Sequence, residues 1–285
     1  MTQVAYLNGE YMPIEEARIP VLDRGFIFGD GIYEVVPVYA GRAFRWPQHL
    51  ARLKRSLAAV GIDDPHSEAG WTGLVSDLVA RHPWPDQFVY MQVTRGVARR
   101  DHAFPRPTVR PTVFAMSSPL VLPAAEQIEQ GVTAVSLPDE RWLHCDIKSI
   151  SLLGNVLARE AAVQAGAVEC VMFRDGFLTE GSASNIWVVR DGRLHGPPAD
   201  NLVLEGVRYG LIHELCAGAD IPLQLRRVLR EEVQVADELI LSSATKEVLP
   251  ITNLDGRAVG DGRPGPVFAK LHAAYQQAKA RLANP

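Results

Sequence analysis

Strand-like runs and tight turns dominate the first part of the chain. Asn8-Gly9 between two short alternating runs predicts a hairpin. The run Tyr33–Tyr39 is rich in strand formers and turns at Ala40-Gly41 to return through Arg42–Trp46. Apolar spacing and helix-opening Pro47 then predict two helices, about 47–61 and 71–79, followed by strands at 88–94 and 111–117. We expect an antiparallel sheet with two helices.

The second half mixes strands, hairpin turns and longer helices. Strands are predicted at 133–137 and 238–243, helices at 152–165, 206–217 and 266–282, and hairpin turns at Asp175-Gly176, Asp191-Gly192 and Asp255-Gly256. The apolar, Pro-containing stretch 119–125 is a candidate linker. The pattern predicts an α+β (mixed α/β) protein with a small N-terminal domain 1–118, a linker 119–125 and a larger C-terminal domain 126–285 that includes Lys148.

Composition is that of a globular protein. Of 285 residues, 47% are hydrophobic and 22% charged, and the net charge of −4 argues against binding nucleic acid through bulk electrostatics. No apolar run approaches the roughly 18 residues of a membrane span, and the N-terminus lacks a secretory pattern, so we expect a cytoplasmic protein. Three widely spaced cysteines predict neither a disulfide framework nor a metal site.

Four segments combine charged or hydroxylated residues with glycine and apolar neighbours. The first is 23–34, with glycines that permit close backbone approach. The second holds Arg100 and His102, which could bind a carboxylate. In the third, Lys148 precedes an apolar run, and a desolvated lysine becomes a nucleophile able to form a Schiff base. In the fourth, Glu180 is either a turn carboxylate or a buried partner for a cation. Singly, each also fits an ordinary loop or solvated surface.

Two further stretches could bind a phosphate. Gly206 opens a helix at Val207 and Arg208, where free N–H groups and the helix dipole favour an anion, although a simple helix cap explains the glycine equally well. A strand ends in hydroxyl groups around Ser243. Arg52, one turn into its helix, could add positive charge.

The ordered set of motifs is more informative than any one of them. FGDGIYEVV, QVTRG followed by R-x-H-x-F-P, RWLHCDIKSISLLGNVLA, TEGSASN and ELILSSATKEVLPI span nearly the whole chain. In this order they resemble the fold-type IV pyridoxal 5′-phosphate enzymes, and most of all the bacterial D-amino acid aminotransferase group.

The resemblance implies a role for each candidate. Lys148 would form the internal aldimine and carry the proton from the substrate, while Glu180 would keep the pyridine nitrogen protonated. The residues implied at the cofactor phosphate are Arg52, Val207, Arg208, Ser243 and Ala244. Those implied at the substrate are Tyr33, Arg100 and His102 for the α-carboxylate, the last two reaching from the partner of a homodimer. Separately from the resemblance, we expect Val35 and Trp142 to line the side-chain pocket.

Two positions depart from the family pattern. Threonine is common where this chain has Arg208, and again where it has Ala244. Loss of both hydroxyls removes hydrogen-bond donors to the phosphate, each worth about 1.5–3 kcal/mol toward a charged group. Cofactor affinity is therefore less well determined by the sequence than cofactor identity.

The implied activity is ping-pong transamination of D-amino acids, with D-alanine and 2-oxoglutarate giving pyruvate and D-glutamate. Tyr33 together with Arg100-x-His102 favours the D-amino acid group. Branched-chain L-amino acid aminotransferases, R-selective amine transaminases and aminodeoxychorismate lyases share the lysine and stay open as alternatives. A cofactor-binding protein without turnover is disfavoured, because such a protein has no need to retain both Lys148 and Glu180.

Overall fold

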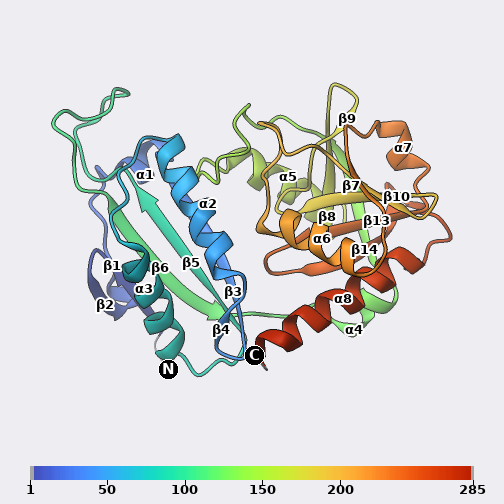
Figure 1. Ribbon diagram of the computed structural model, residues 1–285. Helices are drawn as coiled ribbons and strands as arrows, with labels where there is room; N and C mark the ends of the chain where they lie inside the picture. Colours follow the sequence, from blue (N-terminus) through green and yellow to red (C-terminus); the bar gives the residue numbers. More distant parts are fainter. Residues whose placement is uncertain (1–2, 284–285) are drawn as a thin grey trace. The chain divides into compact units, whose positions relative to one another are not determined.

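The structure is a computed structural model that describes residues 3–283. Its contacts form two compact units (Figure 1), one of residues up to 121 with 147–152, the other of 122–146 with 153–283. Each unit combines a sheet with helices, which confirms the predicted fold class. The limits 1–118, 119–125 and 126–285 stay a prediction, and the short segment carrying Lys148 groups with the first unit.

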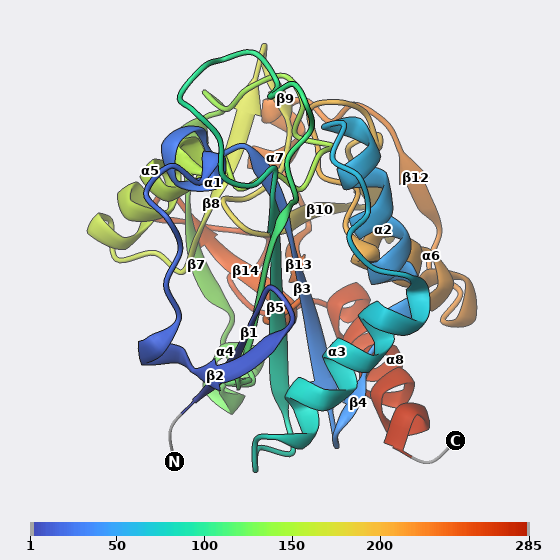
Figure 2. The ribbon, with the colours of Figure 1, turned by 90° about the vertical axis from the view of Figure 1, so that its left-hand side faces the viewer.

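The first unit is built on an antiparallel sheet. Within the described residues its six strands lie in the order β2-β1-β6-β5-β3-β4. The Asn8-Gly9 hairpin and the two helices are as predicted, α2 packing on β3 and α3 on β1, β5 and β6 (Figure 2). The elements are β1 (Val4–Leu7), β2 (Glu10–Pro13), η1 (Ile14–Glu16), α1 (Arg24–Phe28), β3 (Gly31–Tyr39), β4 (Arg42–Ala43), α2 (Trp46–Ala59), α3 (Glu68–Ala80), β5 (Gln87–Thr94) and β6 (Thr112–Pro119).

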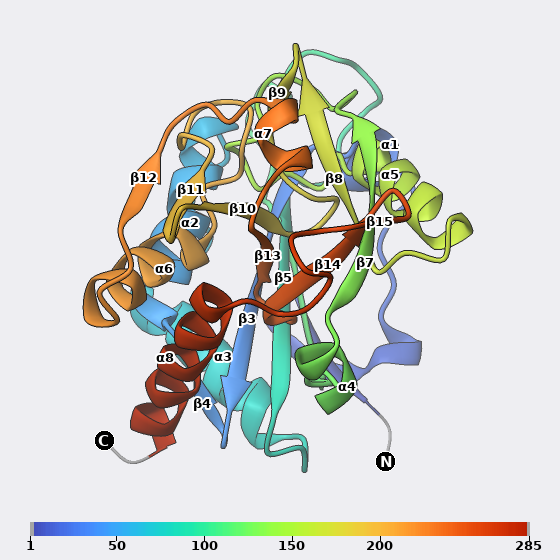
Figure 3. The same cartoon turned by 90° about the vertical axis from the view of Figure 1, so that its right-hand side faces the viewer.

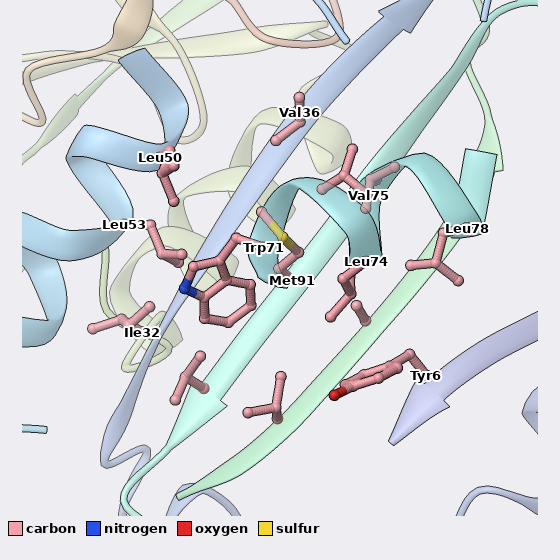
Figure 4. Packing of buried hydrophobic residues seen from close by; sticks show 14 of the residues in the cluster. Tyr6, Ile32, Val36, Leu50, Leu53, Trp71, Leu74, Val75, Leu78 and Met91 are labelled. Atoms are coloured by element: carbon pink, nitrogen blue, oxygen red, sulfur yellow. The ribbon is translucent and has the colours of Figure 1, made fainter. Parts of the chain in front are cut away.

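The helices of this unit cover one face of the sheet with large apolar side chains. Trp71 and Leu78 of α3 and Leu53 of α2 are fully buried against Ile32 and Met91 of the strands (Figure 4). Fully burying a side chain of this size contributes about 1.5–3 kcal/mol. These apolar strand residues therefore face the helices, and the strand residues between them point to the other side of the sheet.

Two local predictions need correction. The strand expected at Arg42–Trp46 is only the two-residue β4, because Trp46 already begins α2. The glycine-rich segment 23–34 is more than a loop, since Asp23 caps the short helix α1 by accepting from the backbone N–H of Gly25 at 2.8 Å.

The second unit is built on a mixed sheet. Within residues 3–283 its nine strands run β12-β11-β10-β13-β14-β7-β8-β9, with β15 paired to β14 (Figure 3). The pairs β14·β7, β7·β8 and β11·β12 are parallel. The elements are α4 (Ala125–Glu129), β7 (Val132–Pro138), α5 (Leu153–Gln164), β8 (Glu169–Arg174), β9 (Phe177–Leu178), β10 (Asn185–Arg190), β11 (Arg193–Gly196), α6 (Val207–Gly218), β12 (Leu223–Leu225), α7 (Arg230–Gln234), β13 (Glu238–Ser243), β14 (Glu247–Leu254), β15 (Arg257–Ala258) and α8 (Pro266–Ala283).

This sheet is covered on both faces. In β8, Val171 and Phe173 point into one apolar cluster while Cys170 and Met172 point into another, beneath α5. A strand buried on both sides reads as a continuous apolar run, as this one does. All three cysteines are buried and unbridged, as predicted. None of the helices within the described chain is long and apolar enough to span a membrane.

Candidate functional site

Lys148 lies on a short segment that continues the edge of the first sheet. The backbone N–H of Tyr33 donates to the Lys148 carbonyl at 2.9 Å, and Ser149 bridges to Ile32. The Lys148 backbone N–H donates to Ser56 Oγ of α2 at 3.3 Å. Its Nζ lies 4.1 Å from the centre of the Tyr33 ring, a distance at which an ammonium and an aromatic face attract. Two residues far apart in the chain, both predicted at the site, therefore meet here.

Arg52 lies one helical turn before Ser56 on α2, in a buried ionic cluster. Its Nε and Nη2 donate to the carboxylate of Glu34 at 2.9 and 2.5 Å, and His49 Nδ1 lies 3.0 Å from the same carboxylate. Glu34 is fully buried. Burial alone would raise the pKa of Glu34, but Arg52 and His49 hold it well below its ordinary value. The guanidinium of Arg52 is thus held in a fixed orientation.

Arg100 and His102 lie on the irregular loop between β5 and β6. Both are exposed, and both approach the ring of Phe28 in α1. The Arg100 guanidinium is 5.4 Å from the ring centre, and the His102 ring is 5.3 Å from it. The structure therefore brings these two side chains together on one aromatic support.

Glu180 belongs to a buried cluster in the second unit. One carboxylate oxygen accepts from Arg141, and the other accepts from Asn185 Nδ2 at 3.2 Å and from the backbone N–H of Leu204 at 3.1 Å. Burial raises the pKa of Glu180, while the guanidinium of Arg141 opposes that rise. Asp139 binds Arg141 from the other side, and that contact overcomes burial and lowers the pKa of Asp139 to about 2. Glu180 is a buried partner for a cation, one of the two alternatives left by the sequence.

Two of the predicted phosphate-binding stretches lie next to Asn185. This side chain also donates to the Leu204 carbonyl at 3.1 Å, just before Gly206 caps α6 at Val207. Asn185 pairs with Ser242 across β10 and β13, next to Ser243 at the strand end. Ser243 is buried and its Oγ accepts from the Lys246 backbone N–H, whereas Ala244 is partly buried. The side chain of Arg208 lies outside the described part of the structure.

Sequence reasoning assigned no role to Arg141, Glu34 or His49. Arg141 carried only a weak signal, its neighbour Asp139 two positions earlier, and such short-range charge pairs usually lie on the surface. Glu34 and His49 are separated by a turn and a strand end, so their pairing with Arg52 depends on how α2 docks on β3. Of the expected pocket residues, Val35 lies partly buried on β3 and Trp142 is 44% exposed in the second unit.

Sequence comparison identifies relatives over almost the whole chain. The family model described as amino-transferase class IV matches residues 31–254. A protein named D-alanine aminotransferase from Staphylococcus epidermidis is 38% identical over 97% of this chain and 98% of its own. One of the same name from Bacillus licheniformis is 38% identical over 94% of each chain.

Solved structures share the fold at lower sequence identity. The branched-chain amino acid aminotransferase of Escherichia coli superposes with a TM-score of 0.91 at 23% identity, covering 97% of this chain and 94% of that one. The branched-chain aminotransferase of the thermophilic archaeon Thermoproteus uzoniensis, solved with norvaline, has a TM-score of 0.88 at 24% identity, covering 99% and 96%. These likenesses describe the fold alone.

Proposed function

The chain belongs to the amino-transferase class IV family, and from that premise we propose that it transfers amino groups from D-amino acids to 2-oxo acids with pyridoxal 5′-phosphate as cofactor. The observation that carries the proposal is the near-complete match to proteins named D-alanine aminotransferase, at 38–39% identity. D-Alanine and 2-oxoglutarate are the proposed pair, giving pyruvate and D-glutamate in two half-reactions.

The donor types of the candidate residues match the groups of this cofactor one by one. An anionic phosphate is matched by the buried guanidinium of Arg52, by the N–H groups that open α6 at Val207, and by the hydroxyl of Ser243. A protonated ring nitrogen is matched by the buried carboxylate of Glu180. The amine of Lys148 supplies the nucleophile for a carbonyl. Arg208 would bind the phosphate through its backbone N–H. Ala244 has no side-chain hydroxyl to donate to the phosphate.

When bound, the cofactor supplies an electron sink for the pair left at the substrate Cα. The chain's own residues then have three tasks: to move a proton at the substrate Cα, to hold a proton on the cofactor ring nitrogen, and to bind the substrate carboxylate. Lys148 would carry the proton from the substrate Cα to the cofactor carbon C4′ in the first half-reaction, and back from C4′ to Cα in the second. The contacts of Glu180 with Arg141, Asn185 and the Leu204 N–H favour its anionic form, which would hold a proton on the ring nitrogen of the cofactor.

We propose that Tyr33, Arg100 and His102 bind the substrate α-carboxylate. Arginine matches a carboxylate with two parallel hydrogen bonds, and fixing that group decides which substituent of Cα faces Lys148. The D-enantiomer is selected if the α-hydrogen, rather than the side chain, faces the amine. Val35 and Trp142 would contact the substrate side chain.

The resemblance places Arg100 and His102 across a homodimer, and exposed apolar residues support a second copy as the partner. Val21 and Phe26 near α1 are 73% and 70% exposed. On α5, Leu153, Val156 and Leu157 form an exposed apolar stripe at helical spacing, the kind of surface that a protein–protein interface covers.

Subunit mixing tests the shared site. Lys148→Ala chains are expected to be inactive and Arg100→Ala chains to have a raised KM and so little activity at low D-alanine, but a mixed dimer regains one site with both residues intact. Co-refolded or co-expressed mixtures should recover up to about half the activity per mixed dimer. Mixtures no more active than the separate variants would contradict sites shared between subunits.

The alternative within the family is transamination of branched-chain L-amino acids. Solved structures that share the fold carry the name branched-chain aminotransferase. Amine transaminases and aminodeoxychorismate lyases have the same lysine chemistry. The three transaminase activities are separated by one experiment, in which the near-visible absorption of the cofactor-loaded protein is followed after adding D-alanine, L-alanine, L-leucine or a carboxyl-free amine.

A change with D-alanine, accompanied by release of pyruvate, is the expected result. A change only with an L-amino acid would transfer the assignment to the branched-chain group. A change only with the amine would assign an amine transaminase, and a cofactor band that none of the four compounds alters would favour a lyase. No cofactor band after loading would refute the role of Lys148.

A further inference from the structure

A buried arginine holds the loop that carries Arg100 and His102. Arg24, the first residue of α1, is 3% exposed. Its Nη1 donates to the carbonyls of Asp101 and Ala103 at 2.5 and 3.3 Å, and its Nη2 to the carbonyl of His102 at 3.4 Å. Three consecutive carbonyls of an exposed loop thus converge on one guanidinium, whose planar donors have a fixed geometry.

Asp30 links this arginine to a second one. Its carboxylate accepts from Arg24 Nε at 2.7 Å, and from Arg95 Nε and Nη2 at 2.8 and 2.9 Å. Arg95 also donates to the carbonyls of Val60 and Gly61 after α2, and its guanidinium lies 3.5 Å from the centre of the Phe104 ring in the same loop. Four consecutive residues of the loop, 101–104, are therefore held by two arginines that share one carboxylate.

The short helix α1 is itself firmly seated. Asp23 accepts from Thr112 Oγ1 of β6 at 2.7 Å, and Arg24 N–H donates to the Gly96 carbonyl at 2.9 Å. Gly25 packs so closely on Thr94 that a Cβ there would collide with the threonine side chain. From this position α1 presents Phe28 to Arg100 and His102, and Arg24 itself lies 4.9 Å from the centre of the same ring.

We propose that Arg24, Asp30 and Phe28 are positioning residues for substrate carboxylate binding: they order the loop so that Arg100 and His102 present their donors together. This inference rests on the proposed function, in which those two side chains bind the α-carboxylate. Without the support, an irregular exposed loop must be ordered at each binding event, at a cost in conformational entropy. The motif containing F-G-D-G thus acts on substrate affinity through the loop.

The test uses the cofactor-loaded, full-length protein with Arg24→Lys and Phe28→Leu. A lysine keeps the charge but cannot reach three carbonyls and Asp30 at once. We expect KM for D-alanine to rise about tenfold in each variant, with kcat changed less than about twofold, because the lost order weakens binding of a remote group. Inhibition by propionate, a carboxylate without an amine, should weaken by the same factor. Arg81→Met is the matched control: Arg81, just after the last residue of α3, also lies over an aromatic ring, that of Tyr11 in β2.

Combination with Arg100→Ala separates positioning from general damage. If Arg24 acts through the loop that carries Arg100, Arg24→Lys should add little to the KM of Arg100→Ala. Independent, multiplicative effects would overturn the proposal, as would an unchanged KM or a loss confined to kcat. Thermal unfolding of each variant shows whether it folds. If Arg24→Lys does not fold, the KM of Phe28→Leu decides whether the positioning role holds.

Hydrogen exchange provides a readout independent of turnover. Amides 98–104 should exchange at least about tenfold faster in Arg24→Lys than in the wild-type chain, and unchanged exchange would overturn the proposal. If the wild-type chain does not react with D-alanine, the proposed function fails while the exchange result still judges the ordering of the loop. If the wild-type chain reacts and the variants match it, only the positioning role fails.

Discussion

Replacing Glu34 with glutamine tests how strongly the buried cluster around Arg52 stabilises the first unit. The carboxylate is fully buried and receives two hydrogen bonds from Arg52, with His49 at 3.0 Å as a third partner. Glutamine has nearly the same shape but no charge and only one acceptor oxygen. The substitution therefore removes the anion that neutralises the guanidinium of Arg52, a residue only 5% exposed.

The size of the effect follows from burial. Removing one partner of a buried ion pair typically costs about 3–5 kcal/mol, because the remaining charge stays desolvated. The two hydrogen bonds from Arg52 are of the charge-assisted kind, each worth about 1.5–3 kcal/mol, which is consistent with that range. We expect Glu34→Gln to lower the free energy of unfolding by about 3–5 kcal/mol at neutral pH.

The assay is urea unfolding as a function of pH. Because the folded-state pKa of Glu34 lies below its ordinary value of 4.5, the stabilisation is fully present above pH 4.5 and is lost as the pH falls through the folded-state pKa. The difference between wild type and variant should therefore shrink in acid. Glu68→Gln is the control: Glu68 pairs with Lys54 at 2.6 Å on the surface, and we expect no measurable change from it.

A difference below about 1 kcal/mol at neutral pH would refute the reasoning, since it would mean that the charge of Arg52 is compensated without Glu34. A large difference that does not change with pH would also contradict it, because the effect would then come from packing. Loss of cofactor phosphate affinity in the same variant, read by equilibrium dialysis, would further tie this cluster to the proposed site.

Three further predictions follow from the site. Lys148→Ala should abolish the covalent bond between chain and cofactor, and with it turnover; substantial residual transamination in purified protein would sink the assignment. Arg141→Met removes the charge that opposes the raised pKa of Glu180, so the acidic limb of the pH profile of kcat/KM should move to higher pH; an unshifted limb would show that Arg141 does not tune Glu180. Ala244→Thr should tighten cofactor binding about tenfold by adding a hydroxyl donor beside Ser243, measured by dialysis, and unchanged affinity would show that the position does not reach the phosphate.

Local elements could be predicted where short-range chemistry decides them. The turns at Asn8-Gly9 and Asp175-Gly176 require left-handed backbone, and the structure has it at all four residues. The helices α2 and α5 end within a residue or two of their predicted limits because their apolar spacing and the prolines and glycines beside them act over a single turn. Shorter elements such as α1 and β12 escaped prediction, since they are too short to show a period.

For the candidate site too, some features could be predicted from the sequence and others could not. Lys148, Glu180, Arg100 and His102 could be proposed from sequence because they lie in motifs whose order along the chain is itself the signal. The environment of each residue depended on tertiary structure. Only docking of α2 on β3 brings Glu34 to Arg52, and only the contact of the 147–152 segment with β3 brings Lys148 over Tyr33.

The sequence by itself thus determined the identity of the reactive groups and the class of fold, because residue types, spacing and turn chemistry are local properties. Tertiary structure decided which carboxylates pair with which arginines, namely the buried Glu34 with Arg52, the buried Glu180 with Arg141 and the partly buried Asp30 with Arg24. Desolvation and charge pairing arise only when segments distant in the chain exclude water between them. These effects set orientation and pKa, and so they decide how the groups named by the sequence can act.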